Sequence, residues 1–320
     1  MGISTHASVV TMPETGQPYP SIVTFLSRRF PAIPRDVWEM RISEGKVLDE
    51  HSRPVTLETP YTPLKRIFYF REVTIEPSIP FSENILFQDD DILVACKPHF
   101  LPVTPGGRYV HECLLNRLRR STGNEDLAPL HRIDRETAGI VLFSVNKRSR
   151  GLYGRLFMEG RVEKTYGALA VCSPSQQPAS WEVADRIERG EPWFRMKSVP
   201  GMINARSAVT LEDVRGDTGR FVLRPHTGKT HQLRVHMSGL GFGILNDRYY
   251  PELQTEREDN FATPLQLVAQ ALRFRDPLTG RVREFASERP LLWNTSTIQP
   301  ENSSSNNTEQ RSNREIKILQ

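Results

Sequence analysis

The run Leu130–Ser144, LHRIDRETAGIVLFS, places a carboxylate among basic side chains and ends in an apolar stretch. Its carboxylate is Asp134, and the basic side chains nearby are His131, Arg132 and Arg135. Neighbouring cations favour the ionised form of a carboxylate, which can then act as a nucleophile or as a base. The same residue types could equally form a salt-bridge cluster on a surface loop. On residue types alone, both interpretations stay open.

This run resembles the signature His-Arg-Leu-Asp-Arg-x-Thr-Ser-Gly-Leu of the RluA-type RNA pseudouridine synthases. It departs from the signature at Ile133, Ala138 and Ile140, and each replacement is chemically mild. Glu136 stands at the variable position of the signature, to which the family gives no role.

Further segments resemble other blocks of the same family and follow the family's order. These segments are Asp89–Gly107, Lys164–Ala168, Pro225–Met237, Ile244–Tyr250 and Leu265–Gly280. Within them, Cys96, Lys229 and Asn246 replace residues that are commoner in the family. Six blocks in the same order are specific for the family, but they do not identify an RNA or a target uridine.

The resemblance implies an isomerase that breaks the bond between ribose C1′ and uracil N1, turns the base and rejoins it through C5. This reaction involves no redox change, hydrolysis or group donor, so we expect no cofactor and no metal. The expected partner is a structured ribosomal or transfer RNA, and the expected role is the processing of that RNA. A protein of the same fold that binds RNA without turnover is the alternative.

The family pattern implies three catalytic residues. Asp134 matches the catalytic carboxylate, Arg234 its ion-pair partner, and Tyr166 the ring that packs on the target base. A buried carboxylate needs such a partner, because desolvation alone favours its protonated form. Whether the carboxylate attacks carbon or removes the ribose 2′ proton stays open. An ordinary helix-surface role for Arg234 and a core role for Tyr166 are the alternatives.

A target uridine must leave its base stack before chemistry can reach C1′. The family fills the vacated space with an arginine, which corresponds to Arg132, and a planar guanidinium can stack on bases. Arg132 could instead only neutralise a phosphate. The remaining expected RNA contacts are His131, Arg135, Lys97, Lys229, His231 and Gln232.

His226, His231 and His236 recur every five residues, which raises the question of a metal site. Side chains on one helix face recur at three and four residues instead, and no nearby cysteine or carboxylate pattern completes a ligand set. We therefore expect no metal. A glycosidase-like hydrolase would need two working carboxylates and would release free uracil.

The 42 Lys and Arg residues against 38 Asp and Glu give a net charge of +4, which is compatible with nucleic-acid binding but does not establish it. No segment approaches the ~20 apolar residues of a membrane span, and the N-terminus lacks the pattern of a secretory signal. Three widely spaced cysteines are typical of a reducing compartment. We expect a cytoplasmic monomer.

Strand patterns outnumber helix patterns and do not alternate regularly with them. This favours an α+β fold, with a mainly antiparallel mixed sheet flanked by helices, over a doubly wound fold. Helices are expected at Val110–Arg120, Lys147–Met158 and Thr230–Ser238, and strands at Ile92–Ala95, Gly139–Ser144, Thr165–Val171, Ser207–Leu211 and Phe221–Leu223. The pseudouridine synthase fold, implied by the resemblance, belongs to this class.

Composition predicts a flexible lead-in (1–20), a small domain (21–73), a linker (74–81), a larger body (82–295) and a disordered polar tail (296–320). The resemblance implies that 82–295 is the catalytic domain. The small domain resembles, more weakly, the two-helix RNA-binding domain of the alpha-L type. It departs from that domain at Leu48–His51. Its cationic face would contain Arg28, Arg29, Arg35 and Arg41, and a purely structural role is the alternative.

Overall fold

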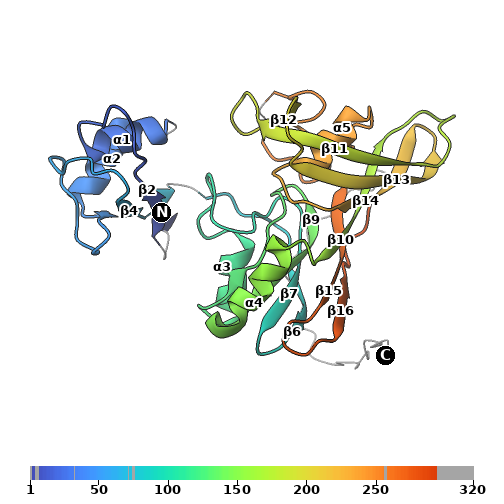
Figure 1. The fold of residues 1–320 in the computed structure, drawn as a ribbon, viewed down its shortest axis with the longest axis horizontal. Helices are drawn as coiled ribbons and strands as arrows, with labels where there is room; N and C mark the ends of the chain where they lie inside the picture. The colour runs from blue at the N-terminus through green and yellow to red at the C-terminus, as the bar shows by residue number, and fades with distance from the viewer. Residues whose placement is uncertain are drawn as a thin grey trace.

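The computed structural model describes residues 2–3, 7–31, 33–70, 72–73, 76–255 and 258–293. The expected tail, 296–320, lies outside the described residues. Two units are described separately below: a small unit (described residues from 2 to 73) and a large unit (described residues from 76 to 293). Figure 1 shows the elements of each.

The small unit packs two helices, α1 (Ile22–Arg29) and α2 (Arg35–Ser43), with a three-stranded antiparallel sheet. The Ser21 hydroxyl caps α1 by accepting a hydrogen bond from the Thr24 amide. The strands are β2 (Ser8–Thr11), β4 (Arg66–Tyr69) and β3 (Val47–Leu48), in the order β2-β4-β3, and β1 (Gly2–Ile3) pairs separately with β5 (Glu72–Val73).

The expectation of a flexible lead-in is wrong for the segment that contains β2. This strand pairs along its whole length with β4, and the following Met12 is buried in the core of the small unit. A strand of four residues is too short to show the alternation of polar and apolar residues by which strands are predicted. Arg41 also differs from expectation, because it is buried and its guanidinium lies 5.2 Å from the Trp38 ring centroid.

The expected linker, 74–81, is likewise not a free connection over its described part. The Glu76 carboxylate accepts hydrogen bonds from the backbone amides of Val110 and His111. Ile79 and Phe81 are buried in a core cluster of the large unit. Residues 76–81, the described part of the segment, lack regular secondary structure, but they pack against the rest of the large unit.

The large unit is built on an 11-stranded sheet with the main order β12-β11-β13-β14-β10-β15-β9-β7-β6. All pairings are antiparallel except that of β15 with β9, while β16 pairs with β15 and β8 with β9. This confirms the expected α+β class with a mainly antiparallel mixed sheet. The strands are β6 (Asn84–Gln88), β7 (Ile92–Lys97), β8 (Ala128–Pro129), β9 (Ala138–Ser144), β10 (Glu163–Val171), β11 (Ala179–Arg189), β12 (Met196–Val199), β13 (Ala205–Arg215), β14 (Thr218–Pro225), β15 (Leu267–Arg275) and β16 (Val282–Ala286).

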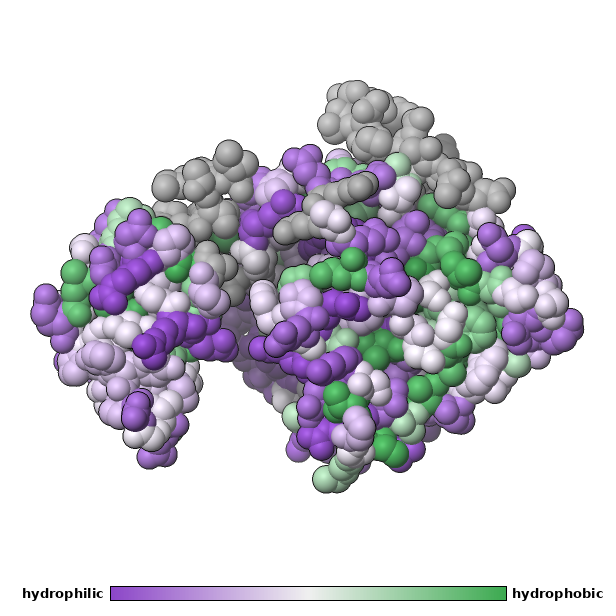
Figure 2. Space-filling model, turned by 90° about the horizontal axis from the view of Figure 1, so that it is seen from above, coloured by the Kyte–Doolittle hydropathy of each residue, from purple (hydrophilic) through white to green (hydrophobic). Residues whose placement is uncertain are grey.

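Three helices cover this sheet: α3 (Leu114–Thr122), α4 (Lys147–Met158) and α5 (Gln232–Gly239). Alternate residues of β7 and β9 pack with α3 in one core cluster and with α4 in another. Both faces of these two strands are therefore buried, which explains their continuous apolar sequences. Figure 1 shows α5 against the other part of the sheet, near β11–β14. In Figure 2, hydrophilic and hydrophobic residues are interspersed over the face in view.

Gly139 allows the parallel pairing of β9 with β15. Its φ of 115° lies in a region that side chains disfavour, and a Cβ atom there would lie 2.2 Å from the Ala269 carbonyl oxygen. Only glycine permits this approach of the two backbones. The pairing brings the loop that precedes β9, which carries Asp134, next to the strands that carry Tyr166 and Leu267.

Candidate active site

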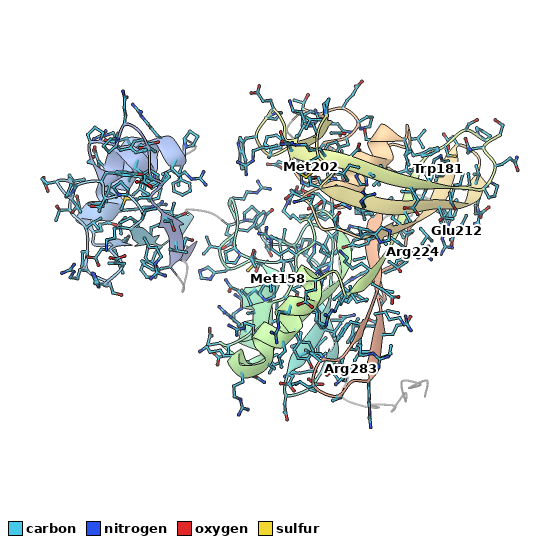
Figure 3. The ribbon with its side chains drawn as sticks, viewed as in Figure 1. Met158, Trp181, Met202, Glu212, Arg224 and Arg283 are labelled. Carbon is cyan, nitrogen blue, oxygen red and sulfur yellow. The ribbon has the colours of Figure 1, made fainter. Side chains whose placement is uncertain are left out.

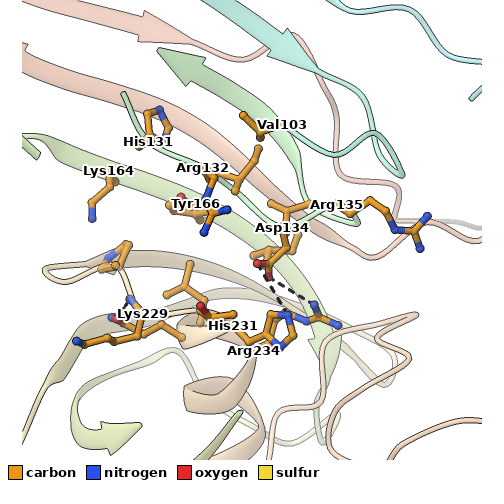
Figure 4. A pocket seen from close by; sticks show the side chains of 18 of the residues that line it. Val103, His131, Arg132, Asp134, Arg135, Lys164, Tyr166, Lys229, His231 and Arg234 are labelled. Atoms are coloured by element: carbon orange, nitrogen blue, oxygen red, sulfur yellow. Dashed lines mark hydrogen bonds and ion pairs between the residues drawn. The ribbon is translucent and has the colours of Figure 1, made fainter. Parts of the chain in front are cut away.

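A cleft of about 610 Å³ contains the residues singled out in the sequence. Its walls come from three segments, residues 102–106, residues 131–135 with Thr137, and residues 225–234, and Lys164 and Tyr166 of β10 line it as well. Figure 4 shows Asp134 facing Arg234 and His231 across this cleft.

Asp134 and Arg234 form an ion pair, with 3.4 Å between Asp134 Oδ2 and Arg234 Nη1. The Asp134 side chain is 24% exposed, whereas that of Arg234 is 1% exposed. The carboxylate is therefore accessible from the cleft, while the arginine that stabilises its negative charge lies behind it.

Asp247 holds Arg234 more tightly than Asp134 does. Arg234 Nε donates to Asp247 Oδ2 at 2.8 Å, and Nη2 donates to Oδ1 at 2.6 Å. Burial alone would lower the pKa of Arg234, but the bond to the buried Asp247 carboxylate keeps that pKa above its ordinary value. This two-point contact occupies Nε and Nη2 and leaves Nη1 to face Asp134.

Glu136 is a second carboxylate near Arg234, with 3.8 Å between Glu136 Oε2 and Arg234 Nη1. Burial raises its pKa, but the charges of Arg135 and Arg234 outweigh that effect and leave the pKa below its ordinary value. Sequence reasoning missed both Glu136 and Asp247 as parts of the site. Asp247 could have been found, because it stands at an Asp position of the family block that Ile244–Tyr250 resembles. Glu136 could not, because it stands at the variable position of the signature.

His231 joins the site at the start of α5, where its φ of 53° places it in the left-handed region. Its Nδ1 lies 3.0 Å from the Tyr250 hydroxyl oxygen, and its Nε2 lies 4.0 Å from Asp134 Oδ1. Burial lowers the pKa of His231 and outweighs the attraction of the nearby Asp134. The imidazole therefore favours its neutral form, which leaves Arg234 as the cation beside Asp134.

Tyr166 lies on β10 between Leu223 of β14 and Ala269 of β15. Burial raises the pKa of its hydroxyl, and the charge of Asp134 raises it further. The phenol therefore stays protonated near neutral pH and places a neutral aromatic ring in the cleft, close to the carboxylate.

Besides Arg234 and Arg135, three cations line the cleft: Arg132, Lys164 and Lys229. Arg132 and Lys229 are exposed, and the Arg132 guanidinium makes no hydrogen bond or ion pair with any residue that the structure describes. Lys164 Nζ donates to the Thr227 carbonyl oxygen at 3.1 Å, and burial lowers its pKa. Lys164 begins the matching block Lys164–Ala168, but the sequence analysis did not predict it as a site residue.

The expectation that Lys97 contacts RNA is wrong, because its side chain is fully buried. Its Nζ donates to the carbonyl oxygens of Pro98, Leu101 and Arg135 at 3.0, 2.6 and 3.0 Å, so all three of its protons are used. Burial lowers the pKa of this amine to about 7. Lys97 therefore ties the loop after β7 to the backbone next to Asp134.

Arg135 also differs from its expected role in RNA binding. Its Nη1 and Nη2 donate to the two carboxylate oxygens of Asp259 at 2.8 and 2.9 Å, and Nη2 also donates to Glu136 at 2.9 Å. Figure 4 shows the side chain pointing away from Asp134. Its hydrogen-bonding groups are engaged within the protein.

Gln232 and His131 are structural as well, although both line the cleft. Gln232 Nε2 donates to the Arg206 carbonyl and to the Ser207 hydroxyl, while its Oε1 accepts from the Lys229 amide, which fixes the loop at 227–229. His131 Nε2 accepts the Leu142 amide, and its ring stacks on Phe157. Burial lowers the pKa of His131 to about 3, so the ring is neutral.

The three regularly spaced histidines occupy different surroundings: His226 is exposed, His231 faces Asp134, and His236 is buried. Within the described residues, no group of three or more histidine, cysteine or acidic side chains is arranged to hold a metal ion. None of the helices described here is long and apolar enough to cross a bilayer.

Comparison with known proteins gives consistent matches. The model of the RNA pseudouridylate synthase family matches residues 91–239. The dual-specificity RNA pseudouridine synthase RluA of Salmonella typhimurium is 31% identical over 205 residues, which cover 63% of this chain and 90% of that protein. An uncharacterised RNA pseudouridine synthase of Synechocystis is 29% identical over 239 residues, 72% of this chain and 79% of that protein. The solved structure of human RNA pseudouridylate synthase domain containing 1 has a TM-score of 0.55 and 25% identity, and the match covers 68% of this chain and 88% of that one.

Proposed function

We infer the function from the premise that this chain belongs to the RluA-type family of RNA pseudouridine synthases and is an isomerase that acts on RNA. We propose that it converts specific uridines of structured ribosomal or transfer RNA to pseudouridine, with Asp134 as the catalytic carboxylate. One observation carries this proposal: an accessible carboxylate in the cleft is paired with a buried arginine that a second carboxylate holds in place.

In this proposal Asp134 acts at the ribose of a flipped uridine. Arg234 stabilises the negative charge of the carboxylate, and Asp247 keeps the guanidinium oriented toward it. The position is compatible both with attack on carbon and with removal of the 2′ proton. A cleft that surrounds the separated uracil limits its escape and keeps C5 within reach of the ribose.

Tyr166 packs its ring on the target base, and its hydroxyl assists proton transfer at C5. Arg132 is the residue that takes the place of the flipped uridine, because its guanidinium is exposed in the cleft and has no partner among the described residues. Lys229 and Lys164 attract phosphate at the same opening. His231 completes the wall beside Asp134.

The small unit is the proposed docking site for structured RNA. Arg28 and Arg29 lie in the last turn of α1, and Arg35 begins α2. Arg35 is engaged with Glu39, which reduces the charge available to a phosphate. The docking contribution is therefore expected to be modest. We further propose that the protein acts as a monomer in the cytoplasm.

Product analysis tests the proposed function. Pseudouridines are mapped across total RNA from cells with and without the gene, and the purified protein is then incubated with RNA from the deficient cells. The proposal expects specific uridines to lose and regain the modification. Release of free uracil would indicate hydrolysis, and binding without either product would indicate a protein that has no turnover.

A further inference from the structure

The connection between β11 and β12, residues 190–195, exposes a large aromatic side chain. Trp193 is 71% exposed, although tryptophan is usually well buried. The exposed residues Arg189 and Lys197 flank the connection at the ends of the two strands. The exposed residues Glu188 and Glu191 lie in or next to the connection too, so the hairpin presents an indole among charged side chains of both signs. Proteins that bind unpaired nucleic acid combine exposed aromatic rings with nearby cations.

A series of ring contacts joins Trp193 to the candidate active site. The Trp193 and Phe194 ring centroids are 5.9 Å apart, those of Phe194 and Tyr249 are 5.2 Å apart, and those of Tyr249 and His231 are 5.6 Å apart. The Tyr249 ring also lies 4.9 Å from the Arg234 guanidinium carbon. The exposed indole is thus continuous with the residues that surround Asp134.

Arg195 fixes the hairpin against the segment that carries Tyr249. Its guanidinium lies over the Tyr250 ring at 5.1 Å, and Nη2 donates to the Pro251 carbonyl oxygen at 2.9 Å. The Met196 amide donates to the Tyr250 hydroxyl at 2.7 Å. The backbone that carries Trp193 is therefore held against the segment 249–251, whose Tyr249 ring contacts His231 and Arg234.

We propose that Trp193 is a stacking surface for an unpaired base of the substrate RNA, close to the target uridine but not next to it. This inference rests on the proposed function, because it assumes that the cleft at Asp134 receives a flipped uridine. Unpaired bases of RNA are bound by stacking on aromatic rings, and flipping one nucleotide removes a stacking contact from the bases next to it. The charged residues around the indole disfavour an apolar protein surface as the partner, and the ring contacts that lead to His231 favour the RNA that occupies the cleft.

Binding of two oligomers of equal charge tests the proposal with the full-length protein. The probes are a fluorescent oligouridine of about 12 nucleotides, a length within the usual range of single-strand sites, and an abasic oligomer of the same length. The variants are Trp193→Ala and Trp193→Phe. Met202→Ala is the matched control, because Met202 is 84% exposed, lies on the connection from β12 to β13 and takes no part in the series of rings (Figure 3).

The unmodified protein is expected to bind oligouridine more tightly than the abasic oligomer. Trp193→Ala is expected to weaken oligouridine binding roughly 5- to 150-fold and to leave abasic binding unchanged, as loss of one base stack requires. Trp193→Phe is expected to keep most of the preference, and Met202→Ala all of it. Trp193→Ala with the original preference, or equal losses for both oligomers, would overturn the proposal.

Two further outcomes separate this inference from its alternatives. If Trp193→Ala leaves both affinities unchanged but alters the oligomeric state in gel filtration, the indole is a protein contact and the proposal fails. If the unmodified protein forms no pseudouridine in any RNA, the proposed function fails, whatever the binding results. An active protein whose oligouridine affinity does not depend on Trp193 refutes this inference alone.

Discussion

Replacing Asp247 by asparagine removes the charge that holds Arg234 in place and leaves nearly the same shape. Asp247 makes two hydrogen bonds to Arg234, and both side chains are almost completely buried. Removing one partner of a buried ion pair costs about 3–5 kcal/mol, because the other charge remains buried. Asp247→Asn is therefore expected to lower the free energy of unfolding by about that amount.

The same change is expected to slow catalysis in the molecules that remain folded. Without the Asp247 charge, Arg234 is free to move toward Asp134 or Glu136, which lie 3.4 and 3.8 Å from Nη1. A displacement of about 1 Å in a catalytic group can reduce the rate on the order of 100-fold. The assay is the single-turnover rate of pseudouridine formation at saturating RNA, normalised to the folded fraction from thermal denaturation.

Asp276→Asn is the matched control for this experiment. Asp276 is also buried and accepts hydrogen bonds from Arg283 and Tyr153. Its partner Arg283 lies at the end of the sheet away from β11–β14 (Figure 3). This variant is expected to lose stability while its folded molecules keep the original rate. A folded Asp247→Asn protein with the original rate, or an equal loss of rate in Asp276→Asn, would refute the positioning role of Asp247.

Three other predictions follow from the structure. Because burial lowers the pKa of His131 from 6.5 to about 3, unfolding takes up a proton in this range, and stability is expected to fall as the pH drops from about 6.5 toward 3. His131→Ala should flatten that decline in urea denaturation, and an unchanged slope would contradict the role of His131. Lys97→Met leaves three carbonyl oxygens in the interior without their donor and is expected to destabilise the protein by at least about 3 kcal/mol. The molecules that remain folded should keep their RNA affinity. A loss of RNA affinity without a loss of stability would show that Lys97 contacts RNA after all. Removing residues 1–74 is expected to weaken binding of a structured RNA. In a plot of the logarithm of the binding constant against the logarithm of the salt concentration, the slope is expected to become shallower by roughly 0.7–0.9 for each lost phosphate contact. A truncated protein that folds with its affinity and salt dependence intact would show that the small unit does not dock RNA.

Burial determined which elements could be recognised from the sequence. The strands β7 and β9 are covered on both faces, so each is a continuous apolar run, and both were predicted. The strands β11 and β12 were missed, because their residues are mostly exposed or half-buried and include many charged side chains. The short strand β2 was missed because its evidence lies in its pairing with β4, far along the chain.

Some residues of the candidate site were likewise predicted correctly from the sequence, and the roles of others were not. Asp134, Tyr166 and Arg234 come together in the cleft, as the matching blocks led us to expect. The sequence does not reveal which way a polar side chain points, so the buried Lys97 was assigned to RNA contact by its position in a matching block. The same limit applies to Arg135, whose partner Asp259 lies far along the chain and outside every block used in the comparison.

The most direct test of the central claim is the pseudouridine yield of Asp134→Asn on an RNA that the unmodified protein modifies. Arg234 keeps its two bonds to Asp247 in this variant, so the fold is expected to persist. RNA affinity is also expected to change little, because it is spread over many phosphate contacts. The account predicts a folded protein that binds RNA and forms no pseudouridine. Pseudouridine formation at the original rate by clean Asp134→Asn protein would contradict it and would move the catalytic role to another residue.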